Sequence, residues 1–233
     1  MLEFALQQTS DGGYIVAGYT GEYIWVLKLS SDGDIEWQRT YGGRDSDVAN
    51  SIQQTSDGGY IVAGYTASFG AGHYDIWVLK LSSDGDIEWQ RTYGGRDSDR
   101  SYSIQQTSDG GYIVAGYTDS FGARNIWVLK LSSDGDIEWQ RIYGGRDSDK
   151  SYSIQQTSDG GYIVAGDTDS FGRGGNNIWV LKLSSDGDIE WQRTYGDGSF
   201  DIAYSIKQTS DGGYIVAGRT SSFGAGHYDI WVL

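Results

Sequence analysis

The nine-residue segment Ser-Asp-Gly-Gly-Tyr-Ile-Val-Ala-Gly occurs five times in this chain. The copies begin at Ser10, Ser56, Ser108, Ser158 and Ser210, so successive copies are separated by 46, 52, 50 and 52 residues. A period of this length is typical of repeat architectures, in which each unit buries its apolar surface against its neighbours. The sequence therefore predicts a modular fold, and it places any specific function at the positions where the units differ.

The second repeat shows four short strand-forming segments and no helical pattern. They are Ser51–Thr55, Tyr60–Thr66, Ile76–Leu81 and Ile87–Tyr93, named strands A, B, C and D of the repeat. Turns rich in Asp and Gly connect A to B and C to D. Strand B is β-branched, aromatic and apolar on both faces, which predicts a sheet buried on both sides.

Four-stranded sheets that are buried on both faces stack radially in β-propellers, which typically have 4–8 blades. We therefore predict an all-β, five-bladed β-propeller of four-stranded antiparallel blades that forms a single domain over residues 1–233. Its approximate repeats are 1–50, 51–100, 101–150, 151–200 and 201–233. The last repeat ends inside strand C, so a three-stranded fifth blade is expected. Its open edge, Ile230–Leu233, is predicted to be tolerated or to pair with a second copy of the chain.

Composition argues against several classes of partner. The formal net charge is −15, and the chain contains no cysteine. An acidic protein lacks the basic surface that binds nucleic acid or an anionic membrane, so neither partner is expected. No apolar stretch is long enough for membrane insertion, and the first residues carry no signal-peptide pattern. Without cysteine there is no disulfide and no thiolate metal site.

Two longer motifs recur along essentially the whole chain. They are Thr-Tyr-Gly-Gly-x-Asp-Ser-Asp-x-x-x-Ser-Ile-Gln-Gln-Thr-Ser-Asp-Gly-Gly-Tyr-Ile-Val-Ala-Gly-Tyr-Thr and Asp-Ile-Trp-Val-Leu-Lys-Leu-Ser-Ser-Asp-Gly-Asp-Ile-Glu-Trp. This unit resembles the bacterial and archaeal β-propeller repeat known as SBBP. The resemblance implies a propeller, usually in exported or cell-surface proteins, with no common enzymatic activity. That repeat is named for seven blades, whereas this chain has five units.

The turn between strands C and D carries a second motif. In the first repeat, Ser30, Asp32 and Trp37 match the pattern Ser-x-Asp-x-Gly-x-x-Trp, while Asp34 stands at the glycine position. The turn is thus similar to the Asp box of sialidase-type propellers. The box is structural in that family, so the resemblance brings no catalytic residue to this chain.

The repeats differ mainly in their B–C and D–A loops, which an up-and-down blade places on one face. Binding commonly lies on loops that a rigid scaffold presents, so we predict a ligand on this face, with unconstrained drift as the alternative. The variable segments are Gly21–Tyr23, Ala67–Asp75, Asp119–Asn125, Asp169–Asn177 and Ser221–Asp229 between B and C, and Val48–Asn50, Arg100–Tyr102, Lys150–Tyr152 and Asp197–Phe200 between D and A.

Aromatic, basic and histidine side chains of the B–C loops are the candidate ligand-binding residues. A recurring loop aromatic can stack on a sugar or anchor a peptide, but packing of the ring on its own blade is the favoured explanation. The two histidines lie in identical segments of different blades and predict no metal site. The candidates are Phe69, His73, Tyr74, Phe121, Arg124, Phe171, Arg173, Phe223, His227 and Tyr228.

Paired aspartates before strand A are weak candidates for calcium. A Ca²⁺ site needs six or more oxygen ligands, and solvated turns or hydrogen bonds to backbone amides also explain the pairs. We expect no cofactor, with Ca²⁺ as the alternative. The pairs are Asp45 and Asp47, Asp97 and Asp99, and Asp147 and Asp149.

Catalysis is not expected from this sequence. A glycosidase places two distinct carboxylates around its substrate, whereas the glutamates of strand D, Glu36, Glu88, Glu138 and Glu190, recur in every complete repeat and are interpreted as exposed cross-strand partners. The predicted function is a noncatalytic scaffold for protein or cell-surface interaction through the variable face. A multivalent lectin-like propeller is the first alternative. An engineered or truncated repeat protein with no function beyond folding is the second.

Overall fold

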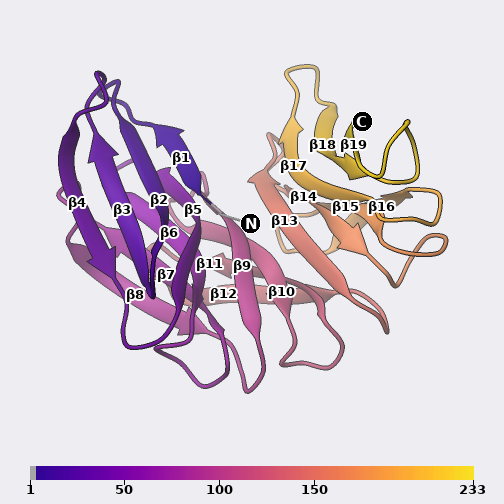
Figure 1. Cartoon of the computed structure of the whole chain (residues 1–233), viewed down its shortest axis with the longest axis horizontal. Coiled ribbons are helices and arrows are strands. Elements are labelled where there is room, and N and C mark those ends of the chain that lie inside the picture. Colours follow the sequence, from indigo (N-terminus) through magenta and orange to yellow (C-terminus); the bar gives the residue numbers. More distant parts are fainter. Residues whose placement is uncertain (1–3) are drawn as a thin grey trace. The chain divides into compact units, whose positions relative to one another are not determined.

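The computed structural model describes residues 4–233, which form β-strands joined by turns and loops (Figure 1). The strands group into five sheets, and within each sheet neighbours follow one another in chain order. The first sheet contains β1 (Ala5–Gln8), β2 (Tyr14–Thr20), β3 (Tyr23–Leu29) and β4 (Ile35–Tyr41). The second contains β5 (Asp47–Gln54), β6 (Tyr60–Thr66), β7 (Asp75–Leu81) and β8 (Ile87–Tyr93).

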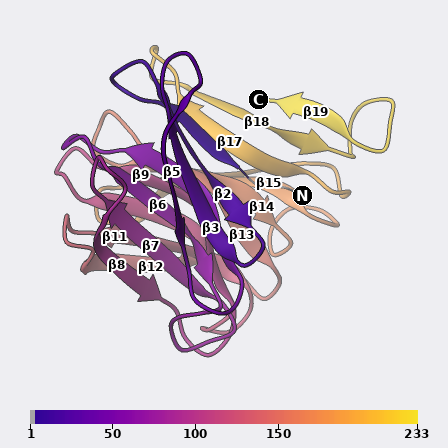
Figure 2. The same cartoon turned by 60° about the vertical axis from the view of Figure 1, so that its left-hand side comes forward.

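The remaining sheets repeat this plan, except that the last has three strands. The third contains β9 (Asp99–Gln106), β10 (Tyr112–Thr118), β11 (Asn125–Leu131) and β12 (Ile137–Tyr143). The fourth contains β13 (Asp149–Gln156), β14 (Tyr162–Thr168), β15 (Asn177–Leu183) and β16 (Ile189–Tyr195). The fifth contains β17 (Ile202–Gln208), β18 (Tyr214–Thr220) and β19 (Asp229–Val232), with β19 at its edge (Figure 2). The predicted strand content is therefore confirmed, including the three-stranded last sheet.

The chain divides into two compact units, which are described separately. Unit 1 comprises Met1–Tyr112 and Leu131–Asp136, and unit 2 comprises Ile113–Lys130 and Ile137–Leu233. The single domain over residues 1–233 stays a prediction. Residues 4–233 include no helix that is long and apolar enough to cross a membrane.

The A–B turns follow directly from the sequence Thr-Ser-Asp-Gly-Gly. In the second sheet, the Asp57 carboxylate accepts hydrogen bonds from the Thr55 hydroxyl at 2.5 Å and from the Gly59 amide at 2.9 Å. Gly58 has a φ of 86°, which a side chain would disfavour. A Cβ atom on Gly59 would lie 2.3 Å from the carbonyl oxygen of Leu81. The turn therefore requires both glycines.

Strand A is longer than the sequence pattern indicates. The predicted D–A loops Val48–Asn50, Arg100–Tyr102 and Lys150–Tyr152 instead lie inside β5, β9 and β13. This prediction is wrong because a β-bulge, between Ser151 and Ser153 in β13, interrupts the alternation that would reveal a strand. Asp197–Phe200 is a loop, as predicted.

The bulged strand also explains a glycine of the repeat. A Cβ atom on Gly166 of β14 would lie 1.8 Å from the carbonyl oxygen of Lys150 in β13. In unit 1, a Cβ atom on Gly64 would lie 1.9 Å from the carbonyl oxygen of Val48. The glycine that ends Tyr-Ile-Val-Ala-Gly is therefore needed for the close approach of strand A.

Neighbouring sheets bury strands B and C against each other. In unit 1, Ile15 and Val26 of the first sheet belong to one core cluster with Tyr60, Val62 and Trp77 of the second. In unit 2, equivalent clusters join β10 and β11 to the fourth sheet, and the fourth sheet to the fifth. Strands B and C of the second and fourth sheets are buried on both faces, as their continuous apolar sequence predicts.

A tryptophan and a tyrosine of strand D donate hydrogen bonds to the C–D turn of the next sheet. In unit 2, the indole of Trp139 donates to the carbonyl oxygen of Ser185 at 3.1 Å, and the hydroxyl of Tyr143 donates to that of Gly187 at 2.5 Å. Trp37 and Tyr41, and Trp89 and Tyr93, form the corresponding bonds in unit 1. The C–D turns therefore link neighbouring sheets.

A buried lysine of strand C joins the A–B turn to strand D. Lys182 lies 3.0 Å from Asp159 and 3.1 Å from Glu190. Hydrogen bonds from the Thr157 hydroxyl, the Gly161 amide and Lys182 lower the pKa of Asp159 to about 2. The cross-strand role predicted for the strand D glutamates is confirmed, because Glu36, Glu88 and Glu138 also pair with Lys28, Lys80 and Lys130.

Candidate ligand-binding site

The phenylalanines of the B–C loops pack on the strand C tryptophan of their own sheet. Ring centroids lie 5.2 Å apart for Phe69 and Trp77, 5.5 Å for Phe121 and Trp127, and 5.0 Å for both Phe171 with Trp179 and Phe223 with Trp231. The four phenylalanines are nevertheless 38–53% exposed. Each ring anchors its loop and leaves part of its surface open to solvent.

His73, Arg173 and His227 are exposed in their loops. Among residues 4–233, no group of three or more His, Cys, Asp or Glu side chains is arranged to hold a metal ion. The expectation that no cofactor binds stays a prediction.

The second aspartate of each recurring pair is buried, so the solvated-turn interpretation is wrong for Asp47, Asp99 and Asp149. Asp149 accepts hydrogen bonds from the Thr168 hydroxyl, from Ser170 Oγ at 2.7 Å and from the Gly145 amide at 2.9 Å. These bonds connect the D–A segment to the start of the B–C loop. The first aspartates, Asp45, Asp97 and Asp147, are exposed.

One position breaks the otherwise constant strand B, Tyr-Ile-Val-Ala-Gly-x-Thr. The residue x is Tyr19, Tyr65 and Tyr117 in the first three repeats, but Asp167 in the fourth and Arg219 in the fifth. The paired position on strand A varies too, because Val48 pairs with Tyr65, Lys150 with Asp167 and Ile202 with Arg219. The repeats therefore differ where strand B enters the B–C loop.

In unit 1, this position belongs to a group of one arginine and two tyrosines. The Arg100 guanidinium carbon lies 4.4 Å from the ring centroid of Tyr65 and 4.3 Å from that of Tyr74. The two rings are 5.2 Å apart and nearly perpendicular, at 87°. Tyr74, a predicted ligand-binding residue, thus packs against a cation from strand A.

In unit 2, Arg124 has both an aromatic and an acidic partner. Its guanidinium carbon lies 4.6 Å from the Tyr117 ring centroid, and its Nε and Nη2 donate to Asp119 at 2.8 and 2.7 Å. This bidentate pair compensates the charge of Arg124 within the chain.

Asp167 of β14 is fully buried. Asn176 Nδ2 donates to Asp167 Oδ2 at 2.6 Å, whereas Asp167 Oδ1 has no hydrogen-bond partner. Burial raises the pKa of Asp167, against the opposing effects of Lys150 and of hydrogen bonds from Asn176 and Tyr152. A buried carboxylate with one unsatisfied oxygen costs stability, and such groups often occur at functional sites.

Aromatic and basic side chains continue from Asp167 toward the fifth sheet. The ring centroids of Tyr152 and Tyr204 are 5.4 Å apart. The Arg219 guanidinium carbon lies 5.9 Å from the Tyr204 centroid and 4.6 Å from the Tyr228 centroid, and its buried Nε has no hydrogen-bond partner. We name Lys150, Tyr152, Asp167, Asn176, Tyr204, Arg219 and Tyr228 the Asp167 cluster.

Of the Asp167 cluster, the sequence predicted only Tyr228 as a ligand-binding residue. The sequence pattern places Lys150 and Tyr152 in a D–A loop and Asp167 in a strand that is buried on both faces. The signal for the cluster was nevertheless present, because Asp and Arg replace Tyr in a segment that is otherwise identical in all five repeats.

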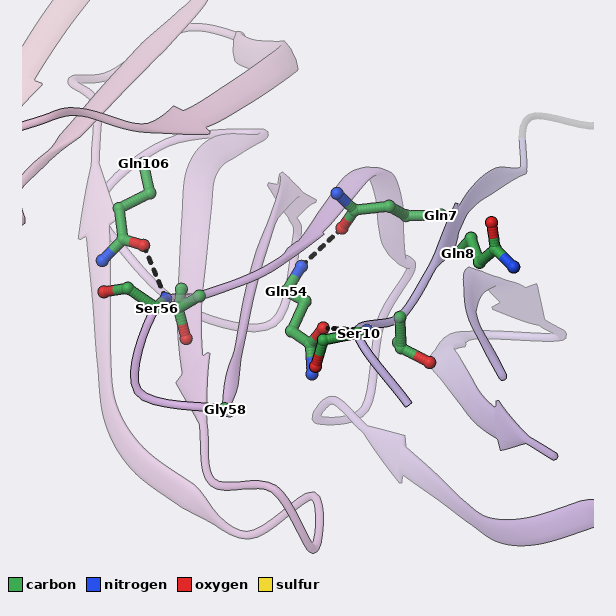
Figure 3. Close-up of a pocket in the computed structure, with 9 residues that line it drawn as sticks. Gln7, Gln8, Ser10, Gln54, Ser56, Gly58 and Gln106 are labelled. Atoms are coloured by element: carbon green, nitrogen blue, oxygen red, sulfur yellow. Dashed lines mark hydrogen bonds between the residues drawn. The ribbon is translucent and has the colours of Figure 1, made fainter. Parts of the chain in front are cut away.

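A second candidate is a pocket of about 580 Å³ at the A–B turns of unit 1 (Figure 3). Here Gln7 Oε1 accepts a bond from the Gln54 amide at 2.6 Å, and Gln54 Oε1 accepts one from the Ser10 amide at 2.8 Å. Gln106 Oε1 similarly accepts a bond from the Ser56 amide at 2.8 Å. These oxygens already bind backbone of a neighbouring sheet, so the pocket is better explained by sheet-to-sheet linkage.

Comparison with solved structures shows the fold. The Dos1 propeller has 14% sequence identity and a TM-score of 0.54, with 90% of this chain and 50% of that chain covered. A protein from Lactobacillus plantarum has 14% identity and a TM-score of 0.54, with 97% and 69% covered. A candidate exo-β-1,3-galactanase from Bifidobacterium bifidum s17 has 14% identity and a TM-score of 0.51, with 94% and 82% covered.

The fold is therefore a β-propeller with five blades, the last of them three-stranded. This chain spans half to about four fifths of the length of those three structures. A scan against protein-family models and a search of curated proteins find no match. The structural neighbours are of mixed function, and their low identity carries only the fold to this chain.

Proposed function

We propose that this protein is a noncatalytic binding module that recognises a surface ligand through the Asp167 cluster and its surrounding loops. The observation that carries this proposal is the break in the repeat. Within strand B, which is otherwise constant in all five repeats, the residue changes where a buried carboxylate, two basic side chains and three tyrosines come together. Identical units provide a rigid frame, and binding groups commonly lie at the variable ends of such a frame.

The composition of the cluster favours a glycan over a protein partner. Carbohydrate-type sites combine aromatic surface with a few fixed hydrogen-bonding groups. Tyr204 and Tyr228 are 40% and 54% exposed, and the Asp167 carboxylate fixes Asn176 through a hydrogen bond. An extended protein surface would instead use an apolar patch, and interaction through such a patch is the second candidate.

A binding screen on a glycan array, with nitrophenyl glycosides assayed in parallel, tests the proposal. The double variant D167Y/R219Y gives both positions the tyrosine found in the first three repeats, so the fold is expected to tolerate it. We expect this variant to lose the array signal of the natural sequence. The exposed turn variant D186N, which removes one negative charge at the C–D end of the same sheet, should keep the signal.

Two results would contradict the proposal. Array signals equal in the natural chain and D167Y/R219Y would place recognition elsewhere. Release of nitrophenol that D167Y abolishes would show that the cluster is catalytic.

A further inference from the structure

The Asp167 cluster also indicates the class of ligand, an inference that rests on the proposed binding function. We propose that the cluster binds a saccharide carrying a carboxylate, such as a uronic acid. Arg219 binds the carboxylate, Tyr152 and Tyr204 contact the face of the sugar ring, and Asn176 bonds a hydroxyl group.

The argument for a carboxylate comes from the contrast between two arginines of unit 2. Arg124 stacks on Tyr117 and is paired in bidentate fashion with Asp119. Arg219 stacks on Tyr228 in a similar way, at 4.6 Å, but its buried Nε has no hydrogen-bond partner. A guanidinium held by aromatic rings is suited to bidentate recognition of a planar anion. Because the Nε of Arg219 is buried, a ligand carboxylate would pair with the terminal nitrogens of its guanidinium and so balance its charge as Asp119 balances that of Arg124.

The argument for a sugar ring comes from the two tyrosines of strand A. Tyr152 and Tyr204 lie on neighbouring blades with centroids 5.4 Å apart and ring planes at 59°. Tyr204 is 40% exposed and Tyr152 is partly exposed. Adjacent aromatic surface of this kind can cover the apolar C–H face of a pyranose while its hydroxyls reach polar groups around it.

Asp167 acts as the positioning residue of the site. It accepts a hydrogen bond from Asn176 Nδ2 at 2.6 Å, which leaves the side-chain oxygen of Asn176 as an acceptor for a ligand hydroxyl. Asp167 is also hydrogen-bonded by Tyr152 and faces Lys150, its partner in the β13–β14 register. A single buried carboxylate therefore interacts with Asn176, Tyr152 and Lys150.

The first test measures binding of three probes to the whole chain by NMR titration at low salt. The probes are D-glucuronate, D-glucose and acetate. We expect D-glucuronate to bind at least tenfold more tightly than either D-glucose or acetate, because only the first has both the ring and the carboxylate.

Two substitutions then separate the roles of Arg219 and Asp167. R219Y should lower D-glucuronate affinity at least tenfold and leave D-glucose affinity unchanged, an effect that general loss of structure would not produce. D167Y should weaken both sugars about equally, since it removes positioning and not charge recognition. D186N is the matched control and should bind all three probes as the natural chain does.

The possible outcomes are distinguishable. Equal affinity for acetate and D-glucuronate would show an anion site without sugar recognition, and equal affinity for both sugars would exclude recognition of the carboxylate. Each result overturns this inference. If none of the probes binds while D167Y/R219Y still abolishes a different array signal, the ligand class is wrong and the proposed function stands. Absence of any array signal that depends on the cluster would overturn both.

Discussion

At the scale of single residues, one substitution within a repeated strand changes the chemistry of a blade. Tyr65 places an aromatic ring beside Arg100, whereas Asp167 at the equivalent position places a buried carboxylate beside Lys150. The carboxylate has lost water and regained only part of its hydrogen bonding, so it destabilises the fold. Such a cost is common where a residue serves binding.

We predict that D167N stabilises the protein at neutral pH and not in acid. Burial raises the pKa of Asp167 in the folded state, despite the opposing effects of Lys150, Asn176 and Tyr152, and nearby Asp169 raises it further. The folded state therefore favours the protonated acid. Its contribution to stability is present below about pH 4, the unfolded pKa, and is lost as the pH rises through the folded pKa.

Urea unfolding of the natural chain and D167N between pH 3 and 8 measures this effect. The variant should be more stable by about 1–2 kcal/mol at pH 7, and the difference should shrink toward zero near pH 3. D186N, which changes an exposed aspartate, should show no such trend. A D167N chain that is less stable at every pH would contradict the prediction.

At the scale of elements, hydrogen bonds from strand D of one blade to the C–D turn of the next blade recur along the fold. The Tyr143 hydroxyl is buried and donates to the carbonyl oxygen of Gly187 at 2.5 Å, and burial raises the pKa of Tyr143. Tyr195 occupies the same position of β16, but the part of the fifth sheet within residues 4–233 includes no C–D turn. Tyr143 and Tyr195 therefore form a matched pair, in which Tyr143 bonds to a C–D turn of the next blade and Tyr195 has no such turn to bond among the described residues.

We predict that Y143F destabilises the protein by about 1–2 kcal/mol, because it leaves the buried Gly187 carbonyl without a donor. Y195F should change the free energy of unfolding by less than about 0.5 kcal/mol. Urea titration of both variants checks the difference. Equal losses of stability in Y143F and Y195F would mean that the hydrogen bond of the Tyr143 hydroxyl does not stabilise the contact between blades.

At the scale of the whole molecule, the fifth blade leaves apolar surface open. Ile230 and Val232 of β19 are 87% and 56% exposed. A pocket of about 350 Å³ beside them is lined by Trp191, Tyr214 and Leu233 among others. An exposed strand edge of this kind pairs readily with another strand, so we propose that copies of this chain associate through Ile230–Leu233.

We predict that appending Ser-Ser-Asp-Gly-Asp-Ile-Glu-Trp-Gln-Arg-Thr-Tyr, the C–D turn and strand D of the other blades, completes the fifth sheet. The added segment should raise the Tm by several degrees by burying β19 and filling the pocket at Trp191. It should also reduce the solution mass measured by light scattering to that of a monomer. A scrambled extension is the control, and equal Tm and mass for both extensions would refute the prediction.

Much of the fold could be predicted because its determinants are local. The turn around Gly58 and Gly59 and the two-sided apolar pattern of strand B specify a buried hairpin without long-range information. Five copies then imply stacking, since no single blade can bury both of its faces alone. The β-bulge in strand A was not predictable from side-chain alternation, because it removes that alternation from the segments at Val48 and Lys150.

The blade, the number of blades and the three strands of the last sheet could be predicted from the amino-acid sequence, because they follow from short-range patterning and from the count of repeats. Which differences between repeats matter depends on the packing of the blades. Asp167 lies in the fourth blade, whereas Tyr204 and Arg219 lie in the fifth, and the three belong to one cluster only because these two blades pack against each other. Burial of Asp167 also depends on that packing, which no local pattern encodes.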